Sequence, residues 1–247
     1  TIFVERLEGY FRLITMKHYC SLLTRINNFF YLLIILLLTS CASLSSERLA
    51  PSFTYAFEAV KNALFGYPDL NITRETVENI PYASALLKIG KGTQGLIILE
   101  KVENSNYEWV SKDKVYIVTR DGRIVRSLGL LNNLTKITSI NQSFEDLITK
   151  PNPVTEYYSY YSFEKPLLLN LKVNVSITNK GLQEIEILGK SMKLILIEES
   201  ITSELIGWKA KNKFWVDPDN YFVWKSIQNI SPKLPEFIVE VTKRPVS

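Results

Sequence analysis

The stretch that follows Cys41 contains no histidine and no further cysteine. The only histidine of the chain is His18, and its two cysteines are Cys20 and Cys41. Residues 42–247 therefore cannot form a Ser-His-Asp triad, a Cys-His pair or a histidine-ligated zinc or iron site. A disulfide within this stretch is excluded as well. Its stability must come from buried apolar side chains, for which the 46% hydrophobic composition of the chain is adequate.

The motifs and the charge of the chain also give no indication of nucleotide or nucleic-acid binding. The chain has no Gly-x-x-x-x-Gly-Lys-Ser/Thr loop to cradle phosphates. Residues 1–40 hold four of the 29 basic and two of the 25 acidic residues, so residues 41–247 carry a net charge of +2. This balance provides no basic stripe for a phosphate backbone. We therefore expect no cofactor, no metal and no nucleic-acid partner.

A short apolar run followed by a cysteine dominates the first part of the chain. Residues 29–38 form an apolar core of about ten residues, whereas a bilayer-spanning helix needs roughly 20. Such a core, between a basic start and a small-residue segment ending at Cys41, is typical of a bacterial lipoprotein signal. We expect cleavage before Cys41 and attachment of a diacylglyceryl group to its thiol. Ala42 favours the outer membrane over retention in the inner membrane.

The expected domain organisation follows from this signal. The first methionine is Met16, so residues 1–15 are interpreted as upstream sequence from a misassigned start, with a long basic leader as the alternative. We expect residues 1–40 to be a signal peptide, residues 41–51 a lipidated tether, and residues 52–247 a single β-rich periplasmic domain.

Hydrophobic spacing predicts short helices followed by many strands. Apolar residues three and four apart predict a helix at 52–65, and Thr73 can cap a second helix at 74–79. Beyond residue 83 the period changes to two, which predicts strands, with a short helix at 144–148. The predicted strands are 83–89, 95–102, 107–111, 114–120, 123–127, 156–163, 169–178, 182–188, 192–198, 207–216, 221–230 and 237–241.

Tight turns separate these predicted strands. Asp121-Gly122 predicts a type I′ hairpin turn, and further turns are expected at 179–181, 189–190 and 217–220. Short strands joined in this way favour an antiparallel meander, and about twelve strands are too many for one flat sheet. The predicted fold class is all-β, mainly antiparallel, as a curled or barrel-like β-meander sheet with one or two short N-terminal helices.

Aromatic residues provide the candidate contact surface. Tyr157, Tyr158, Tyr160 and Tyr161 share one predicted strand, whose alternation places Tyr158 and Tyr160 on one face and Tyr157 and Tyr161 on the other. One of these pairs is expected to be exposed and to contact a glycan or a protein partner. The four tryptophans are interpreted as core residues.

Paired carboxylates are the only catalytic arrangement left open, because glycoside hydrolysis needs no more than two of them. The candidate pairs are Glu184/Glu186, Glu198/Glu199 and Asp217/Asp219. Glu184 and Glu186 alternate with apolar residues as on the solvated face of a strand, and Asp217/Asp219 belongs to a turn sequence. The protein is therefore not expected to be an enzyme.

Five segments resemble the YjbF/GfcB family of group 4 capsule polysaccharide lipoproteins. The similar segments are 80–84 (IPYAS), 109–111 (WVS), 122–130 (GRIVRSLGL), 214–218 (FWVDP) and 223–226 (VWKS). The resemblance implies an outer-membrane lipoprotein that works beside an outer-membrane β-barrel and a periplasmic protein of polysaccharide export. It carries over no catalytic residue. Within it, Gly122 is assigned to the turn and Arg123 to a cross-strand salt bridge or a partner contact.

Three functions follow from these observations. The first is a non-catalytic factor for capsule or exopolysaccharide assembly or export, anchored through Cys41 in the outer membrane and facing the periplasm. The second is a lipid or lipoprotein carrier or acceptor with an apolar cavity in the curled sheet, since residues 214–218 are also similar to carriers of the LolA/LolB type. The third is a glycan hydrolase, for which the sequence gives no specific support.

Overall fold

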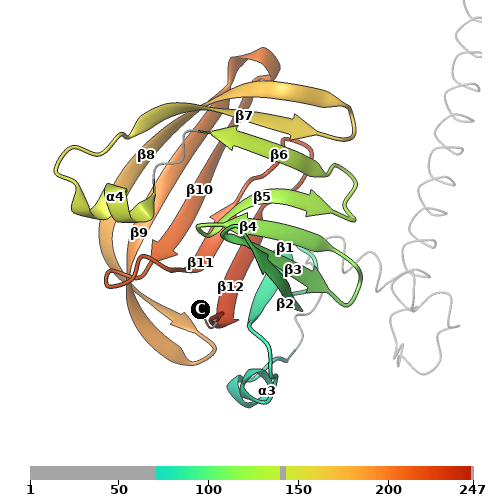
Figure 1. Cartoon of the computed structure of the whole chain (residues 1–247), viewed down its shortest axis with the longest axis vertical. Coiled ribbons are helices and arrows are strands. Elements are labelled where there is room, and N and C mark those ends of the chain that lie inside the picture. Colours follow the sequence, from blue (N-terminus) through green and yellow to red (C-terminus); the bar gives the residue numbers. More distant parts are fainter. Residues whose placement is uncertain (1–70, 140–142, 246–247) are drawn as a thin grey trace, which may run out of the picture. The chain divides into compact units, whose positions relative to one another are not determined.

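The described chain forms one antiparallel sheet of twelve strands that curls into a nearly closed barrel (Figure 1). The computed structural model describes residues 71–139 and 143–245. The predicted fold class is confirmed. The strands are β1 (Ser84–Ile89), β2 (Gly95–Glu103), β3 (Asn106–Ser111), β4 (Tyr116–Arg120), β5 (Arg123–Leu128), β6 (Leu134–Ser139), β7 (Glu156–Phe163), β8 (Leu168–Ile187), β9 (Lys190–Ser203), β10 (Trp208–Val216), β11 (Val223–Gln228) and β12 (Phe237–Lys243).

The sheet is a meander with one long-range junction. Its order is β5-β4-β3-β2-β1-β12-β11-β10-β9-β8-β7-β6, so β1 pairs with β12 in the middle, with Ser84 opposite Lys243. The edge strands β5 and β6 follow each other in the chain, and the Leu134 amide donates to Ser127 Oγ over 2.9 Å between them. This bond occupies backbone groups that an open edge would leave free.

Helices are short in the described residues. They are α3 (Arg74–Glu78), α4 (Phe144–Thr149) and the 3₁₀ turn η2 (Glu204–Ile206). Thr73 caps α3 by accepting from the Thr76 amide over 3.2 Å, as the sequence predicts. None of these helices is both long and apolar enough to cross a membrane. The helix predicted at 52–65 lies outside the described residues, as do the signal peptide and the tether.

Two connections differ from the sequence prediction. The turn predicted at 179–181 is wrong, because β8 runs as one strand through a register irregularity between Asn179 and Leu182. Asn179 Oδ1 accepts from the Gly181 amide over 2.9 Å, which bends the strand as a bulge without ending it. The β8–β9 turn lies at Leu188-Gly189, one residue earlier than predicted, where both residues have positive φ. Strand β6 has no predicted counterpart.

The loop between β1 and β2 contains three glycines with the spacing of a dinucleotide-binding motif. Gly90, Gly92 and Gly95 match the Gly-x-Gly-x-x-Gly pattern of dinucleotide-binding folds. That function requires a turn from a strand into a helix within a parallel sheet. Here the loop joins two antiparallel strands, so the glycines serve a hairpin connection.

The core fills the inside of the curled sheet. Phe214 and Phe237 are fully buried there, and inward positions alternate with exposed ones along β8. Trp109 and Trp208 are buried in this core, Trp215 is buried in a second cluster with Leu194 and Leu196, and Trp224 is half-buried between the two. The interpretation as core residues is therefore confirmed for three of the four tryptophans. The sheet therefore encloses packed side chains, and any binding site must lie at its ends or on its outer face.

Connections alternate between the two ends of the sheet. The end with α4 also carries the β4–β5, β8–β9 and β10–β11 turns and the residues after β12, and is called the α4 end. The opposite end carries the β5–β6, β7–β8, β9–β10 and β11–β12 connections and is called the η2 end. Each end holds one cavity of interest.

Candidate functional site

The four tyrosines of β7 divide between two environments, as their alternation predicts. Tyr158 and Tyr160 are exposed on the outer face, at 54% and 40%. Lys172 on β8 lies over the ring of Tyr158, with its Nζ 3.7 Å from the centroid. Tyr161 is buried inside the sheet and Tyr157 is half-buried there. The outer pair is therefore the one that a partner or a glycan could reach.

Arg123 is directed into the interior and paired with Glu199 on β9. Its Nη2 and Nε lie 2.7 and 2.9 Å from Glu199 Oε1, and Glu199 is only 4% exposed. The guanidinium also lies over the ring of Phe144, 3.9 Å from its centroid. Burial alone would lower the pKa of Arg123, but the Glu199 carboxylate outweighs it and raises the pKa. The geometry fits the predicted salt bridge, although it crosses the sheet interior between non-neighbouring strands.

The inner tyrosines share this buried environment. Burial, reinforced by the charge of Glu199, raises the pKa of Tyr157 to about 12. The same causes raise the pKa of Tyr161 as well. Both phenols thus stay neutral beside the ion pair, and they pack in the interior of the fold rather than on its surface.

This environment predicts a loss of stability at alkaline pH. The folded-state pKa of Tyr157 lies above its unfolded value of about 10, so its contribution is fully present below pH 10 and is lost as pH rises toward about 12. We expect the urea midpoint of Tyr157→Phe to decline less than that of the parent chain over this range. Tyr158→Phe, on the exposed face, is the matched control and should follow the parent. Equal decline in all three proteins would contradict the assignment.

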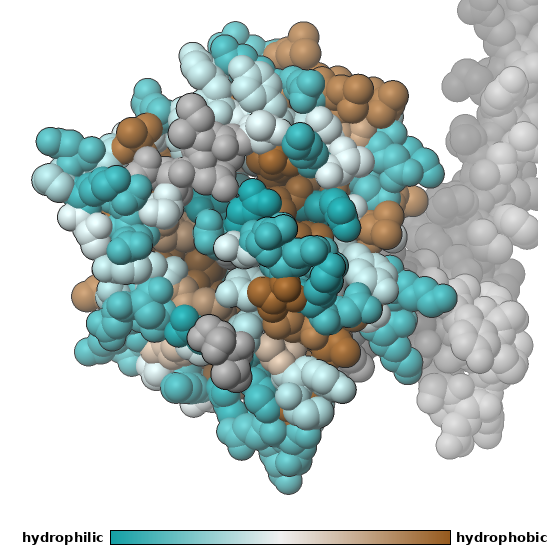
Figure 2. Space-filling model, viewed as in Figure 1, coloured by the Kyte–Doolittle hydropathy of each residue, from teal (hydrophilic) through white to brown (hydrophobic). Residues whose placement is uncertain are grey.

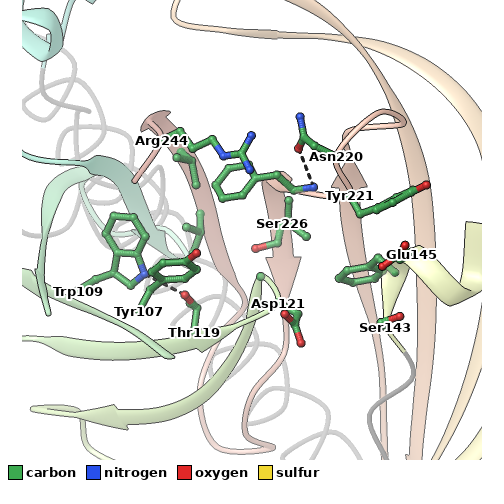
Figure 3. Close-up of a pocket in the computed structure, with 16 residues that line it drawn as sticks. Tyr107, Trp109, Thr119, Asp121, Ser143, Glu145, Asn220, Tyr221, Ser226 and Arg244 are labelled. Carbon is green, nitrogen blue, oxygen red and sulfur yellow. Dashed lines mark hydrogen bonds between the residues drawn. The ribbon is translucent and has the colours of Figure 1, made fainter. Parts of the chain in front are cut away.

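A cavity of about 300 Å³ opens at the α4 end (Figure 3). Aromatic rings and polar side chains line it together. The aromatic residues are Tyr107, Trp109, Phe144, Tyr221 and Phe222, and the polar ones include Asp121, Ser143, Glu145, Asn220, Ser226 and Arg244. We call it the α4-end cavity. It combines flat apolar surface with charged and amide groups, which is the composition of a site for a polar ligand with apolar faces.

Hydrogen bonds fix the aromatic side of this cavity. Trp109 Nε1 donates to Thr119 Oγ1 over 2.9 Å, and the rings of Tyr107 and Trp109 lie 6.4 Å apart (Figure 3). The guanidinium of Arg244 lies over the ring of Phe222, 4.7 Å from its centroid. These contacts hold the rings in one arrangement before any ligand enters, which lowers the entropy cost of binding.

The β10–β11 turn supplies the opposite wall. Asp217 Oδ1 accepts from the Asp219 amide over 2.9 Å, and its Oδ2 accepts from Trp224 Nε1 over 3.1 Å. Burial alone would raise the pKa of Asp217, but these hydrogen bonds prevail and lower it. Asn220 Oδ1 accepts from the Phe222 amide over 3.1 Å. The turn predicted at 217–220 is therefore present, and it orients Asn220, Tyr221 and Phe222 at the cavity.

The carboxylate pairs named from the sequence have local partners. Glu184 and Glu186 are exposed, and Glu184 accepts from Ser191 Oγ over 2.5 Å. Glu198 faces Lys180 and Lys213 at 3.5 and 3.9 Å on the outer face, whereas Glu199 points inward to Arg123. Asp217 and Asp219 share the turn just described.

No pattern in the sequence predicts the α4-end cavity. Its residues come from β3, β4, the β4–β5 turn, α4, β11, β12 and their connections, which only the curled sheet brings together. One local signal was available: Tyr107 and Trp109 are two residues apart and share a face of β3. Nothing in the sequence spacing of Asn220, Glu145 and Arg244 indicates that these three side chains line one cavity.

The fold and the site together define the class of protein. It is a curled antiparallel sheet with a cavity at one end that is lined by aromatic and polar side chains. Residues 57–242 match the family described as "Group 4 capsule polysaccharide lipoprotein gfcB, YjbF", so the chain belongs to this family of lipoproteins. The resemblance found in the sequence is confirmed. Membership in a lipoprotein family implies anchoring to a membrane.

Individual relatives agree with this assignment. The chain is 23% identical to "Uncharacterized lipoprotein YjbF" of Escherichia coli (strain K12), over 76% of this chain and 84% of that protein. It is 22% identical to "Uncharacterized lipoprotein GfcB" of the same strain, over 65% and 75%. The crystal structure of the hypothetical lipoprotein YmcC from Escherichia coli (K12) has a TM-score of 0.64 at 19% identity, covering 81% of this chain and 99% of that one. This likeness supports the fold.

Proposed function

We propose that this lipoprotein binds a segment of a surface polysaccharide without cleaving it and so assists capsule or exopolysaccharide assembly or export. In this proposal Cys41 carries the diacylglyceryl anchor, and the domain faces the periplasm from the outer membrane. Its partners are an outer-membrane β-barrel and periplasmic export proteins. The α4-end cavity carries the proposal, and the family, whose description names a capsule polysaccharide, supports it.

The composition of the cavity suits a sugar ring. A pyranose offers hydroxyl groups around its rim and C–H groups on its faces. The hydroxyls can donate to the carboxylates of Asp121 and Glu145, and the C–H faces can lie on the rings of Tyr107 and Tyr221. Its volume of about 300 Å³ lies at the low end of ligand pockets, so one ring fits while its chain neighbours continue outside.

The exposure of these carboxylates supports binding without cleavage. A general acid of glycoside hydrolysis works from a largely apolar pocket. Asp121 and Glu145 are both exposed to solvent, where they can accept hydrogen bonds from a sugar.

A binding titration tests the proposal. The acylated full chain in detergent micelles is titrated with oligosaccharides released from the surface polysaccharide of the source cells, with intrinsic fluorescence as the readout. Tyr107→Ala combined with Tyr221→Ala should weaken binding about tenfold, since each aromatic contact contributes about 0.5–1.5 kcal/mol. Tyr158→Ala, on the outer face, should leave the affinity unchanged, and a loss of binding in this variant alone would place the glycan on β7 instead. Affinities that the pocket variant leaves unchanged, or new reducing ends in the mixture, would refute the proposal.

A carrier role is the second candidate, favoured by a separate observation. A cavity of about 500 Å³ at the η2 end is lined largely by apolar residues, among them Phe163, Leu168, Ile206 and Trp208. Such a space could accept an acyl chain. Mass spectrometry of protein isolated without detergent distinguishes the two roles, because a carrier would retain a stoichiometric lipid.

A further inference from the structure

Three successive turns at the η2 end display aliphatic side chains to solvent. Leu131 in the β5–β6 connection is 90% exposed, Leu167 before β8 is 73% exposed, and Leu205 in η2 is 79% exposed. Leu169 and Ile206 beside them are also exposed. Single exposed apolar residues are ordinary, but five gathered at one end of a sheet indicate a contact surface. Figure 2 shows hydrophobic residues at the end where the β7–β8 and β9–β10 connections lie.

Two of these turns are joined to each other and to the β11–β12 connection. Asn132 Nδ2 donates to the Lys165 carbonyl, and Ser231 Oγ donates to Asn132 Oδ1. Asn133 Nδ2 donates to Glu164 Oε2 over 2.6 Å. The β5–β6, β7–β8 and β11–β12 connections thus form one linked rim, which carries Leu131 and Leu167, while Leu205 lies in the separate β9–β10 connection.

The chemistry of the η2 end favours a lipid surface over a protein partner. Its exposed apolar groups are all leucine or isoleucine, whereas protein interfaces are enriched in tyrosine, tryptophan, methionine and arginine. Lys165, Lys209 and Lys233 are exposed at this end, and so are Glu164, Glu204 and Glu236, so both signs of charge flank the leucines. Aliphatic tips in such surroundings match acyl chains below zwitterionic headgroups, which also carry both signs. The membrane anchoring that the lipoprotein family implies brings such a leaflet within reach.

We propose that the η2 end inserts Leu131, Leu167 and Leu205 into a phospholipid leaflet, with the flanking charged side chains at the level of the headgroups. This contact goes beyond the proposed function, because it requires neither the α4-end cavity nor a glycan. It adds a second attachment to the anchor at Cys41. Two attachments fix the orientation of the domain, whereas an anchor alone does not.

The length of the tether allows this orientation. Helix α3 is held at the α4 end, where Arg74 Nη2 donates to the Ile187 carbonyl over 2.6 Å. The 29 residues between Cys41 and Asn71 can span at most about 70 Å, because the 14 that are predicted to be helical at 52–65 rise only about 1.5 Å each. The longest strand, β8, has 20 residues and covers about 66 Å. The chain can therefore pass from the α4 end back to a leaflet at the η2 end, and the α4-end cavity then opens away from the membrane.

Site-specific labelling tests the proposal. The acylated chain, which has no free thiol after cleavage before Cys41, is reconstituted into vesicles of phosphatidylethanolamine and phosphatidylglycerol. A fluorophore is attached at Leu167→Cys, at Leu205→Cys or, as the control at the α4 end, at Asp219→Cys. Brominated acyl chains should quench the first two labels, and aqueous iodide should quench the third. Both quenchers acting alike on all three labels would overturn the proposal.

A second variant separates insertion from mere proximity. With the label at Ile206→Cys, changing Leu131, Leu167 and Leu205 to serine should abolish quenching by the brominated lipid. Tyr82→Ser with Val154→Ser removes two comparably exposed apolar groups elsewhere and should leave it intact. Quenching that depends on protein density would indicate a second copy of the chain, and crosslinking of Leu167 to a protein in cells without lipid quenching would indicate a protein partner. Either result would overturn the proposal and leave the saccharide titration unaffected.

Discussion

Replacing Glu199 with glutamine is expected to lower the free energy of unfolding by about 3–5 kcal/mol, because the change leaves a buried guanidinium without its counter-charge. Arg123 is largely shielded from water in the folded state, since its side chain is only 13% exposed and lies over Phe144. Glutamine preserves the shape and one hydrogen-bond acceptor, so the loss reports the charge. Urea unfolding followed by tryptophan fluorescence measures it.

Two further variants serve as controls for this prediction. The double variant Arg123→Met with Glu199→Leu removes both charges and should be far more stable than Glu199→Gln, because buried pairs can be replaced by apolar residues at little cost. Glu103→Gln breaks the exposed pair between Lys101 and Glu103, whose side chains are each 53% exposed, and should leave stability nearly unchanged because solvent screens the pair. A loss for Glu199→Gln no larger than that for Glu103→Gln would show that the interior tolerates the unpaired charge.

The substitution Gly122→Ala is expected to cost about 2–5 kcal/mol and to deform the α4-end cavity. Gly122 has φ +73° in the β4–β5 turn, a conformation that costs other residues about 1–2 kcal/mol. An added Cβ would also lie 2.4 Å from Cβ of Val223, which cannot rotate away because that atom is attached directly to the backbone. This close contact with Val223 adds an overpacking cost of about 1–3 kcal/mol to the backbone cost.

Gly181 provides a matched control for the steric term. Its φ is +79°, close to that of Gly122, but an added Cβ there would meet nothing within 4 Å. Gly181→Ala should therefore show only the backbone cost. Equal losses for the two variants in thermal or urea unfolding would mean that Val223 moves aside freely. Since Val223 lines the α4-end cavity, saccharide binding should fall only in the Gly122 variant.

Local features of the sequence were sufficient for every strand except β6 and for dividing the tyrosines of β7 between two faces. Alternation separated Tyr158 from Tyr161 without indicating which face is exposed, and Asp121-Gly122 gave the hairpin turn, with φ values of 49° and 73°. These outcomes depend on neighbours within a few residues. The break predicted at 179–181 failed because turn residues can also form a bulge when the partner strand continues, and β9 does continue.

The site itself depends on how far the sheet curls, which no local pattern specifies. Arg123 and Glu199 are 76 positions apart, and Gln228 reaches β5 across 104 positions to accept from the Ile124 amide over 2.8 Å. The α4-end cavity similarly joins Tyr107 to Arg244. Contacts between residues so far apart in the chain depend on the tertiary structure. The sequence could therefore suggest residue types for a glycan surface but not where these residues lie.

The pairing of β1 with β12 has a consequence for the order of assembly. Ser84 and Lys243 face each other in the middle of the sheet, so the two ends of the domain must be present together before the barrel can close. Contacts between such distant residues form slowly, because a long loop must first lose its freedom. A partly synthesised chain thus stays open until its last strand emerges. Under the proposed periplasmic location, that delay keeps the chain unfolded while it crosses the inner membrane.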